Sequence, residues 1–382
     1  MQSYQYHYQL KHNITEKPTV KVGVAGSGNL EVIVRSSKDP LMTEFTIKTT
    51  ISGFEATWKA VIDRFAQDYP YSGLSFLLQD AGATPPVVAL RLRQAFETYQ
   101  SGYLRGKNYI EMDARERIYS LVDENSFREF LLDEDCHSPH LQSLRMQTEE
   151  DDGVVIGIAQ LDGKQIGIAS QQKNFIGGSV GEVHGAKING LVKYAVKNRL
   201  EAVVLLIDSG GVRLQEANVG EIEISEIIRS ILEGRSSGVK MVGVICGNNG
   251  AFGGMGILSG VMDALIVNQT ARIGVSGAEV IQAMKGVEAF DASDRPLIWR
   301  VYGGRTRFMQ HAADYYTSNQ VSDISKMLVT AMHELDSAHL INFETVLEEQ
   351  KRLQTRIQSA GNSTEQGEWL KAHLPKGFDE DL

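Results

Sequence analysis

The spacing of apolar and polar positions divides this chain into a short N-terminal region and a longer region with a different rhythm. In the first region the pattern predicts a strand at 45–51, a helix at 54–65, a strand at 75–78 and, after a break at Pro85-Pro86, a helix at 91–99. Apolar runs also flank the turn Gly26-Ser27-Gly28-Asn29, which is typical of a hairpin. Residues 1–100 are therefore expected to form a small α+β domain.

A polar joint at 101–108 is the expected linker to the second region. Helices are predicted at 113–121 and 126–132, and the acidic run at 148–152 is predicted to be a solvated loop. A last helical region from 324 continues past 347 into a charged tail, whose role the pattern leaves open.

From residue 154 onward the pattern alternates between strands and helices. Strands are predicted at 154–159 and 166–170 and near 203, 242 and 265, with helical stripes at 188–196 and 224–232. This rhythm predicts right-handed βα crossovers and a mostly parallel sheet. Residues 109–382 are assigned to this second domain.

Two glycine turns follow predicted strands of the second domain. The strand ending at Ile207 runs into Asp208-Ser209-Gly210-Gly211, and the strand ending at Cys246 leads to Gly253-Gly254. Glycines let backbone N–H groups face outward, and two such turns can direct amides at one negative oxygen, as in a thioester enolate. Plain strand-to-helix turns or close helix packing are the alternatives.

A third glycine group, Gly177-Gly178-Ser179, joins a strand to a helix and is a candidate lining of an acyl-thioester pocket. His184 and Lys187 follow it near the helix start. A general acid there is conceivable, but the expected role is that of a solvated or capping residue, since geometry must come before pKa. Arg213 and Glu216 have the spacing of a structural ion pair on one helical turn.

Ser27 lies between glycines at the tip of the predicted hairpin, where it is expected to be exposed and accessible to a modifying enzyme. An ordinary hairpin turn is the alternative. The chain contains no Gly-x-Ser-x-Gly elbow for a serine triad and no dinucleotide-binding glycine fingerprint after its first strand.

Composition excludes several classes of function. The 382 residues carry a net charge of −10, which gives no electrostatic case for nucleic acid or a membrane surface as a partner. Cys136 and Cys246 have no metal-ligand spacing, and two cysteines suit a reducing cytosol. Without a signal pattern or an apolar run of ~18 residues, a cytoplasmic protein is expected.

Two sets of motifs resemble malonate decarboxylase. The stretches 177–183 (GGSVGEV), 209–216 (SGGVRLQE) and 273–281 (IGVSGAEVI) resemble the β subunit of the biotin-independent enzyme, a relative of the acetyl-CoA carboxylase carboxyltransferases. Residues 22–32 and 80–86 resemble its δ subunit, the acyl carrier protein. The resemblance implies a ClpP/crotonase-like β-sheet superhelix preceded by a small acyl-carrier domain, in a natural or engineered fusion.

The resemblance also implies a cofactor and a reaction. Ser27 is expected to carry 2'-(5''-phosphoribosyl)-3'-dephospho-CoA through a phosphodiester, and malonyl on its thiol is expected to lose CO2 and become acetyl. Amides around Gly210 and Gly211 are expected to hold the enolate. Gly253 and Gly254 are expected to supply a second donor or shape the pocket.

Partners and alternatives follow from the same resemblance. A γ subunit is expected to share the active site, an α subunit to exchange acetyl for malonyl, and a transferase to attach the prosthetic group. The absence of a four-cysteine zinc ribbon and of a biotin-carrier lysine motif implies neither metal nor biotin. A biotin-dependent carboxyltransferase acting on an acyl-CoA and a non-catalytic carrier scaffold remain alternatives.

Overall fold

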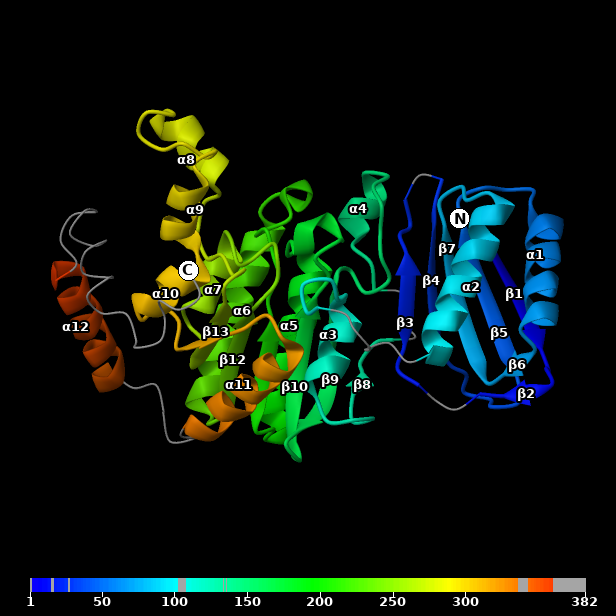
Figure 1. The fold of residues 1–382 in the computed structure, drawn as a ribbon, viewed down its shortest axis with the longest axis horizontal. Helices are drawn as coiled ribbons and strands as arrows, with labels where there is room; N and C mark the ends of the chain where they lie inside the picture. The colour runs from blue at the N-terminus through cyan, green and yellow to red at the C-terminus, as the bar shows by residue number, and fades with distance from the viewer. Residues whose placement is uncertain are drawn as a thin grey trace. The chain divides into compact units, whose positions relative to one another are not determined.

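The computed structural model describes residues 2–14, 17–26, 28–101, 108–132, 134, 136–335 and 343–359 (Figure 1). The chain forms two compact units, residues 1–107 with 141–149, and residues 108–140 with 150–382. Most of the expected linker, Ser27 and the charged tail beyond 359 lie outside the described residues.

The first unit is built on a five-stranded sheet with the order β1-β5-β7-β4-β3. Its strands are β1 (Gln2–Tyr8), β3 (Val20–Gly23), β4 (Leu30–Ser36), β5 (Thr43–Thr49) and β7 (Leu74–Asp80), and β2 (His12–Asn13) pairs separately with β6 (Tyr71–Ser72). The antiparallel pairing of β3 with β4 confirms the predicted hairpin. The edge strand β1 was not predicted, because its half-buried tyrosines alternate with polar residues and give a weak apolar signal.

Helices α1 (Glu55–Asp68) and α2 (Pro85–Ser101) pack on this sheet through an aromatic core. Trp58 and Phe65 of α1 and Phe96 of α2 are buried in the same cluster as Phe45 and Phe76, whose rings stack with centroids 4.8 Å apart. The two prolines begin α2 rather than interrupt the chain before it, because the first helical N–H groups have no partner inside a helix.

The second unit is built on a seven-stranded sheet with the order β14-β13-β12-β11-β10-β9-β8. Its strands are β8 (Arg128–Glu129), β9 (Val154–Leu161), β10 (Lys164–Gln171), β11 (Ala202–Leu206), β12 (Lys240–Ile245), β13 (Ala264–Asn268) and β14 (Tyr315–Thr317). From β10 to β14 all neighbours run parallel, as the rhythm predicts. The predicted helix at 126–132 is wrong: its residues pair with β9, and Phe130 donates its amide to Ile156 (2.8 Å).

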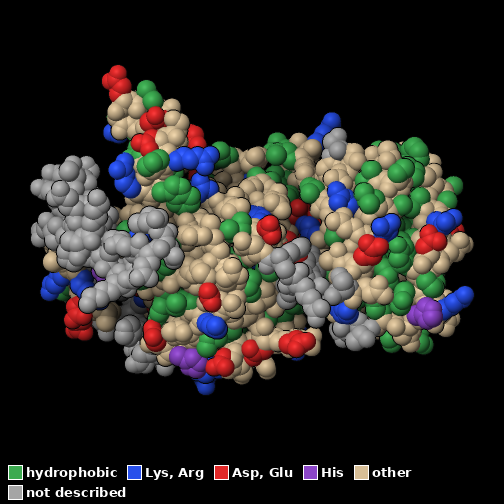
Figure 2. Space-filling model, viewed as in Figure 1, with side chains coloured by type: hydrophobic (Ala, Val, Ile, Leu, Met, Phe, Trp, Pro, Cys, Tyr) green, Lys and Arg blue, Asp and Glu red, His purple; other side chains and the backbone are tan. Residues whose placement is uncertain are grey.

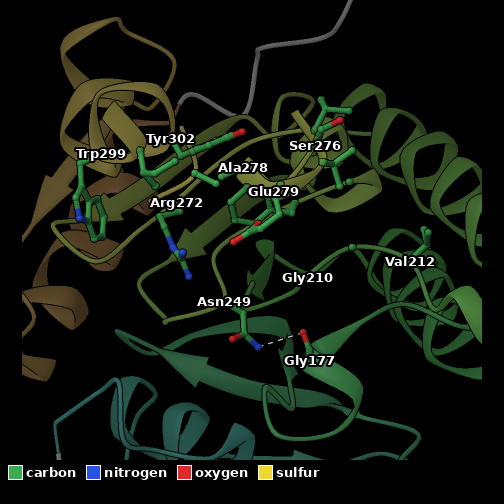
Figure 3. Close-up of a pocket in the computed structure, with 18 of the residues that line it drawn as sticks. Gly177, Gly210, Val212, Asn249, Arg272, Ser276, Ala278, Glu279, Trp299 and Tyr302 are labelled. Carbon is green, nitrogen blue, oxygen red and sulfur yellow. Dashed lines mark hydrogen bonds between the residues drawn. The ribbon is translucent and has the colours of Figure 1, made fainter. Parts of the chain in front are cut away.

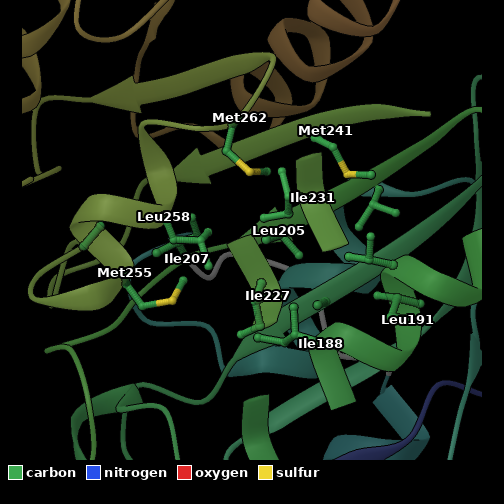
Figure 4. Packing of buried hydrophobic residues seen from close by; sticks show 14 of the residues in the cluster. Ile188, Leu191, Leu205, Ile207, Ile227, Ile231, Met241, Met255, Leu258 and Met262 are labelled. Atoms are coloured by element: carbon green, nitrogen blue, oxygen red, sulfur yellow. The ribbon is translucent and has the colours of Figure 1, made fainter. Parts of the chain in front are cut away.

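Helices cover both faces of the sheet. One face is covered by α3 (Ala114–Leu121) and α11 (Val321–Glu334), and the other by α5 (Glu182–Asn198), α6 (Val219–Ser236) and α7 (Gly254–Ser259). The remaining helices of the unit are α4 (Pro139–Ser143), α8 (Ala278–Lys285), α9 (Arg295–Tyr302), α10 (Gly304–Met309) and α12 (Phe343–Ser359), and 3-10 turns lie at Ile176–Gly178 and Leu214–Glu216. Alternate residues of β11 point to opposite faces: Leu205 packs with α5, α6 and α7 (Figure 4), and Val204 packs with α3 and α11.

A second, shorter row of parallel pairing follows the strands. Just beyond β11, β12 and β13, Ser209 bridges to Ala251 and Ala251 bridges to Ile273. The backbone that leaves each strand is therefore held beside its neighbour before the next helix begins. This row sets the loops at the carboxyl edge of the sheet.

The acidic run at 148–152 is buried rather than solvated. Asp151 is 8% and Asp152 0% exposed. Arg115 lies 2.9 Å from Asp151, and Arg213 lies 2.9 Å from Asp152. The prediction of a hydrated loop is wrong because the cationic partners come from distant parts of the chain, which a local charge pattern does not reveal.

His184 and Lys187 are also buried, so the prediction that they are solvated or capping residues is wrong. Nδ1 of His184 donates to the Asp152 carbonyl (3.2 Å), and Nε2 accepts from the Gln171 amide (3.2 Å). Lys187 donates to the carbonyls of Asp151 (2.7 Å) and Val154 (2.6 Å). Burial, reinforced by Arg213 and Lys187, lowers the pKa of His184 well below its usual 6.5.

The neutral state of His184 predicts a pH-dependent stability. Below pH 6.5 the unfolded chain binds a proton that the folded chain does not, so the free energy of unfolding falls as the pH falls. The imidazole of His184 thereby lowers the free energy of unfolding by roughly 0.7 kcal/mol between pH 7 and pH 6. Burial raises the pKa of Asp152 to about 6, so the folded chain takes up a proton there already within this window, which offsets roughly half of the loss, and it offsets more below pH 6.

We expect His184→Gln, which keeps a polar side chain at this place, to remove the fall in the free energy of unfolding between pH 7 and 6, because only the opposing contribution of Asp152 is then left. Urea unfolding of wild type and variant, at several pH values in that range, measures the difference. Equal slopes in the two proteins would contradict the assignment of a buried neutral imidazole.

Candidate functional site

The loops that follow β11, β12 and β13 line a pocket of about 800 Å³ in the second unit (Figure 3). Gly177 and Asn249 lie on one side of it, where a hydrogen bond joins them. Arg272 and Trp299 lie at one end, and Val212 lies at the other. Residues from β-strand loops and from α8 and α9 thus surround one space.

Four of the predicted site residues line this pocket, namely Gly177, Gly210, Gly211 and Gly253. Gly254, Gly178 and Ser179 are adjacent in sequence but are not part of its lining. Gly178 has a structural reason to be glycine, because its φ is +68° and an added Cβ would lie 2.1 Å from the Asp208 carbonyl oxygen. Ser179 donates its hydroxyl to the Ile176 carbonyl (2.6 Å).

The two glycine turns contact each other. Gly211 has a φ of +126° and Gly253 a φ of +55°, which L side chains rarely adopt. A Cβ on Gly253 would lie 3.3 Å from the Gly211 Cα and 3.8 Å from the Val212 nitrogen. Glycine at both positions therefore permits this close approach.

The backbone N–H groups of three predicted donors already form hydrogen bonds with acceptors of the same chain. Gly210 donates to the Gly177 carbonyl (2.9 Å), Gly211 to the Ser209 hydroxyl (3.1 Å) and Gly253 to the Val275 carbonyl (3.0 Å). The expectation that these three N–H groups face outward does not match the hydrogen bonds. They build the turns instead.

Two backbone N–H groups next to these donors have no hydrogen-bond acceptor among the described residues. Among the residues that the structure describes, neither the Val212 nor the Gly254 N–H finds an acceptor. Val212 directly follows Gly211 and lines the pocket, and Gly254, one of the predicted site residues, is the first residue of α7. Of the four predicted glycines, only Gly254 thus keeps a backbone N–H without an acceptor in the described part of the chain, and Val212 lies one residue beyond the predicted pair Gly210-Gly211.

Asp208 holds the two loops together. It follows β11, is fully buried, and accepts from the amides of Asn249 (2.6 Å) and Gly250 (3.2 Å) through Oδ1. Its Oδ2 lies 2.8 Å from the Arg117 guanidinium, an ionic contact without the angle of a hydrogen bond. A Cβ on Gly247 would lie 2.0 Å from Oδ2, so that glycine makes room for the carboxylate.

Asn249 extends this connection to the third glycine group. Its side-chain amide donates to the carbonyls of Gly177 (3.1 Å) and Lys173 (3.1 Å). Asn249, Asp208 and Arg117 were not among the residues predicted for the site. Asp208 and Asn249 come directly after buried strands, and this position was the feature of the sequence that could have indicated a functional role.

The ion pair predicted between Arg213 and Glu216 is confirmed, with Nη1 and Oε1 2.7 Å apart and both side chains buried. Arg213 also contacts Asp152 and donates to the Ser179 carbonyl (3.3 Å). Burial raises the pKa of Glu216, but hydrogen bonds from the Glu182 amide, from Ser138 and from Arg213 outweigh it and lower the pKa. This network holds the loop of the third glycine group.

Two cations and a carboxylate line the end of the pocket formed by α8 and α9, namely Arg272, Arg295 and Glu279. Arg272 donates to the Asn248 carbonyl (2.5 Å), and its guanidinium carbon lies 5.9 Å from the centre of the Phe252 ring. The rest of this wall is mostly apolar and includes Trp299. The pocket therefore combines apolar surface with positive charge.

The turn of the first unit that contains Ser27 leaves room for an attached group. Ser27 itself lies outside the described residues, but Gly28 is exposed, has a φ of +72°, and a Cβ there would meet no atom within 4 Å. Hydrogen bonds from Gly28 to Ala81 (2.8 Å) and from Asn29 to Gly26 (2.8 Å) hold both sides of the turn. These flanks fit a bulky covalent group at the tip.

Two other features are absent from the described ranges. No group of three or more His, Cys, Asp or Glu side chains there is arranged to hold a metal ion. No helix in the same ranges has the length and apolar character needed to cross a membrane.

Asp208→Asn is expected to destabilise the second unit by about 3–5 kcal/mol, because it leaves the Arg117 guanidinium buried without its counter-charge. The double variant Asp208→Asn/Arg117→Met is expected to lose less than the sum of the single changes. Urea unfolding of the three variants measures this coupling. Strictly additive losses would show that the two side chains do not interact.

Comparison with known proteins identifies both halves of the chain. The family model for malonate decarboxylase delta subunit (MdcD) matches residues 17–99, and the model for the carboxyl transferase domain matches residues 104–297. The malonyl-S-ACP:biotin-protein carboxyltransferase MADC of Malonomonas rubra is 34% identical over 269 residues, 65% of this chain and 84% of that protein. The malonate decarboxylase acyl carrier protein of Stenotrophomonas maltophilia is 42% identical over 105 residues, 27% of this chain and 97% of that protein.

Solved structures agree with this assignment. One chain of a Pseudomonas malonate decarboxylase hetero-tetramer in complex with malonate matches with a TM-score of 0.58 and 36% identity, over 60% of this chain and 84% of that one. A transcarboxylase 12S chain matches at 20% identity with a TM-score of 0.51, over 64% and 44% of the two chains, and shares the fold. The second unit therefore has the expected crotonase-like carboxyltransferase fold. The chain belongs to the malonate decarboxylase family and joins an acyl carrier domain of the delta-subunit type to a carboxyl transferase domain.

Proposed function

We propose that this chain decarboxylates a malonyl thioester carried on its own acyl carrier domain, giving an acetyl thioester and CO2. Residues 1–100 act as the carrier and residues 109–382 as the decarboxylase domain in this proposal. The observation that carries it is the contact between two glycine turns beside the pocket, each followed by an unpaired backbone amide. The family assignment supplies the substrate class.

The prosthetic group proposed at Ser27, phosphoribosyl-dephospho-CoA, supplies the thiol that carries malonyl. The amide of Val212, which lines the pocket, and that of Gly254, which directly follows the lining residue Gly253, are proposed to hold the thioester oxygen. As the bond to the departing carboxylate breaks, its electron pair moves toward this oxygen, CO2 leaves, and the amides stabilise the enolate charge. Such donors contribute about 3–4 kcal/mol each to lowering the barrier. A proton added at carbon completes the acetyl group.

Gly210, Gly211 and Gly253 serve this chemistry by building the turns rather than by donating. Their internal hydrogen bonds hold the following amides in place before the substrate arrives, which is the condition for strong electrostatic stabilisation. Gly177 is proposed to form the side of the pocket along which the acyl end of the arm lies, and Gly178 and Ser179, which do not line the pocket, are proposed to hold that loop in place. Arg272 and Arg295 make that pocket attractive to an anionic substrate.

A partner subunit is proposed to cover the mouth of the pocket. Large apolar side chains from α8, α9 and the adjoining loops are unusually exposed there, namely Val275 (62%), Val280 (51%), Met284 (79%), Val287 (57%) and Trp299 (41%). In Figure 2 hydrophobic, basic and acidic side chains are interspersed over the projecting α8–α9 segment. The similar Pseudomonas enzyme is a hetero-tetramer. A γ subunit is proposed to cover this surface. An α subunit that exchanges acetyl for malonyl is proposed from the resemblance to the family.

A second candidate function is carboxyl transfer to biotin on a partner protein. The specific observation in its favour is the 34% identity to the Malonomonas rubra carboxyltransferase MADC. Both reactions need the same stabilised oxygen, so the glycine turns do not distinguish decarboxylation from carboxyl transfer. The two reactions differ in whether the carboxyl group leaves as CO2 or is attached to biotin.

The loaded chain, assembled with its partner subunits, is expected to release CO2 from carbon-labelled malonyl at the same rate with and without a biotinylated carrier protein. Labelled CO2 and labelled carboxybiotin are measured in parallel. CO2 release that requires the biotin protein, together with label on biotin, would replace decarboxylation by carboxyl transfer as the function.

Gly254→Pro is expected to lower kcat about 10²–10³-fold, because it removes one amide donor at a first helical position that tolerates proline. Gly254→Ala is the matched control: its Cβ meets the same Ile224 side chain at 2.6 Å, but the amide stays. Single-turnover decarboxylation by both folded variants gives the comparison. Equal rates for the two variants would exclude Gly254 as a donor.

Met284→Asp is expected to prevent assembly with the partner subunit, because it places a charge on the exposed apolar surface of α8. Leu232→Asp, on α6 and 37% exposed, is the control and is expected to assemble normally. Size-exclusion chromatography of each variant co-expressed with its partners measures assembly. An intact complex with Met284→Asp would place the interface elsewhere.

A further inference from the structure

The first unit contains a pocket of about 260 Å³ that the proposed chemistry does not use. It lies where α1 and α2 begin, and its apolar lining includes Ile51, Phe54, Trp58, Val61 and Val88. Trp58 and Val88 are buried, whereas Ile51 and Phe54 form a rim that is 42% and 52% exposed. An aromatic cavity with exposed apolar side chains at its rim is the kind of place where a ring binds.

The one carboxylate that lines this pocket, that of Asp80, already accepts hydrogen bonds from neighbouring residues. Asp80 accepts from the amides of Gly82 (3.1 Å) and Ala83 (2.8 Å) through Oδ1 and from the Thr49 hydroxyl (2.7 Å) through Oδ2. It therefore shapes the turn at the end of β7. A negatively charged acyl end would lie against this carboxylate, so the pocket favours a neutral group.

The pocket adjoins the turn of Ser27. Gly28 donates to the Ala81 carbonyl (2.8 Å), and Ala81 donates to the Asn29 carbonyl (3.2 Å). Gly82 belongs to the pocket lining, and a Cβ on it would lie 4.0 Å from the Gly28 nitrogen and 3.3 Å from Cδ1 of Ile51. Because Ser27 is bonded to Gly28, a group attached to it starts beside the rim.

We propose that this pocket binds the adenine ring of the prosthetic group, an inference that rests on the proposed function. Adenine is the aromatic part of that group nearest to Ser27, while the thiol is at the far end. The volume is below the ~300–1,000 Å³ of pockets that enclose a whole drug-sized ligand, which suits a single ring. Phe54 and Trp58 offer surfaces for base stacking, and only the pantetheine part is then left to swing.

The chain offers a direct probe, because Trp58 is one of only three tryptophans. The full chain is labelled with 5-fluorotryptophan and co-expressed with its transferase, and intact mass establishes loading. Trp58→Phe assigns the fluorine signal. The Trp58 signal is expected to differ between the loaded chain and the unloaded Ser27→Ala chain, and the difference is expected to persist after a nucleotide pyrophosphatase removes the pantetheine part.

Thr57→Phe fills the pocket from its exposed rim and is expected to abolish this difference while loading continues. Ala60→Phe, exposed on the same helix and outside the lining, is the control and is expected to retain it.

The outcomes separate the two proposals. A wild-type chain without added mass overturns the proposed carrier function together with this inference. A loaded chain with an unchanged Trp58 signal overturns the adenine site alone. A difference that disappears after pyrophosphatase treatment assigns the pocket to the pantetheine end and likewise overturns the adenine site.

Discussion

The buried carboxylate of Asp208 is the interaction on which the candidate site depends. It is placed by the end of β11 and receives two backbone amides from the loop that follows β12, so the loops after adjacent strands are joined through one side chain. Hydrogen bonds to a charged group stabilise by about 1.5–3 kcal/mol each, more than bonds between neutral groups. Arg117 supplies the counter-charge that makes a carboxylate tolerable in this interior.

This arrangement explains why so much of the site is backbone. Parallel strands deliver their loops to one edge of the sheet, and the row of bridges at Ser209, Ala251 and Ile273 continues their pairing past that edge. The glycine turns then approach more closely than side chains permit. Amide dipoles held in this way need no rearrangement when charge develops, which is the basis of the proposed catalysis.

The two units divide the proposed reaction between them. The first is a small sheet with two helices whose exposed hairpin tip is suited to hold a covalent arm. The second provides a pocket with positive charge and an apolar surface for a partner. If the first unit also holds the adenine ring, the mobile length of the arm is shorter than its covalent length. Fewer conformations then have to be searched before the acyl group reaches the site.

The sequence by itself determined the strands β9 to β13 and the helices α5 and α6 between them, the β3–β4 hairpin and the two glycine turns, because these depend on local periodicity and on the conformations open to glycine. Only the tertiary structure decided which amides remain unpaired and that the acidic run and His184 are buried. The tertiary structure also shows that residues of the predicted helix at 126–132 instead form a strand paired with β9. In each case the partner atoms are far away in sequence, and local patterns carry no information about such partners.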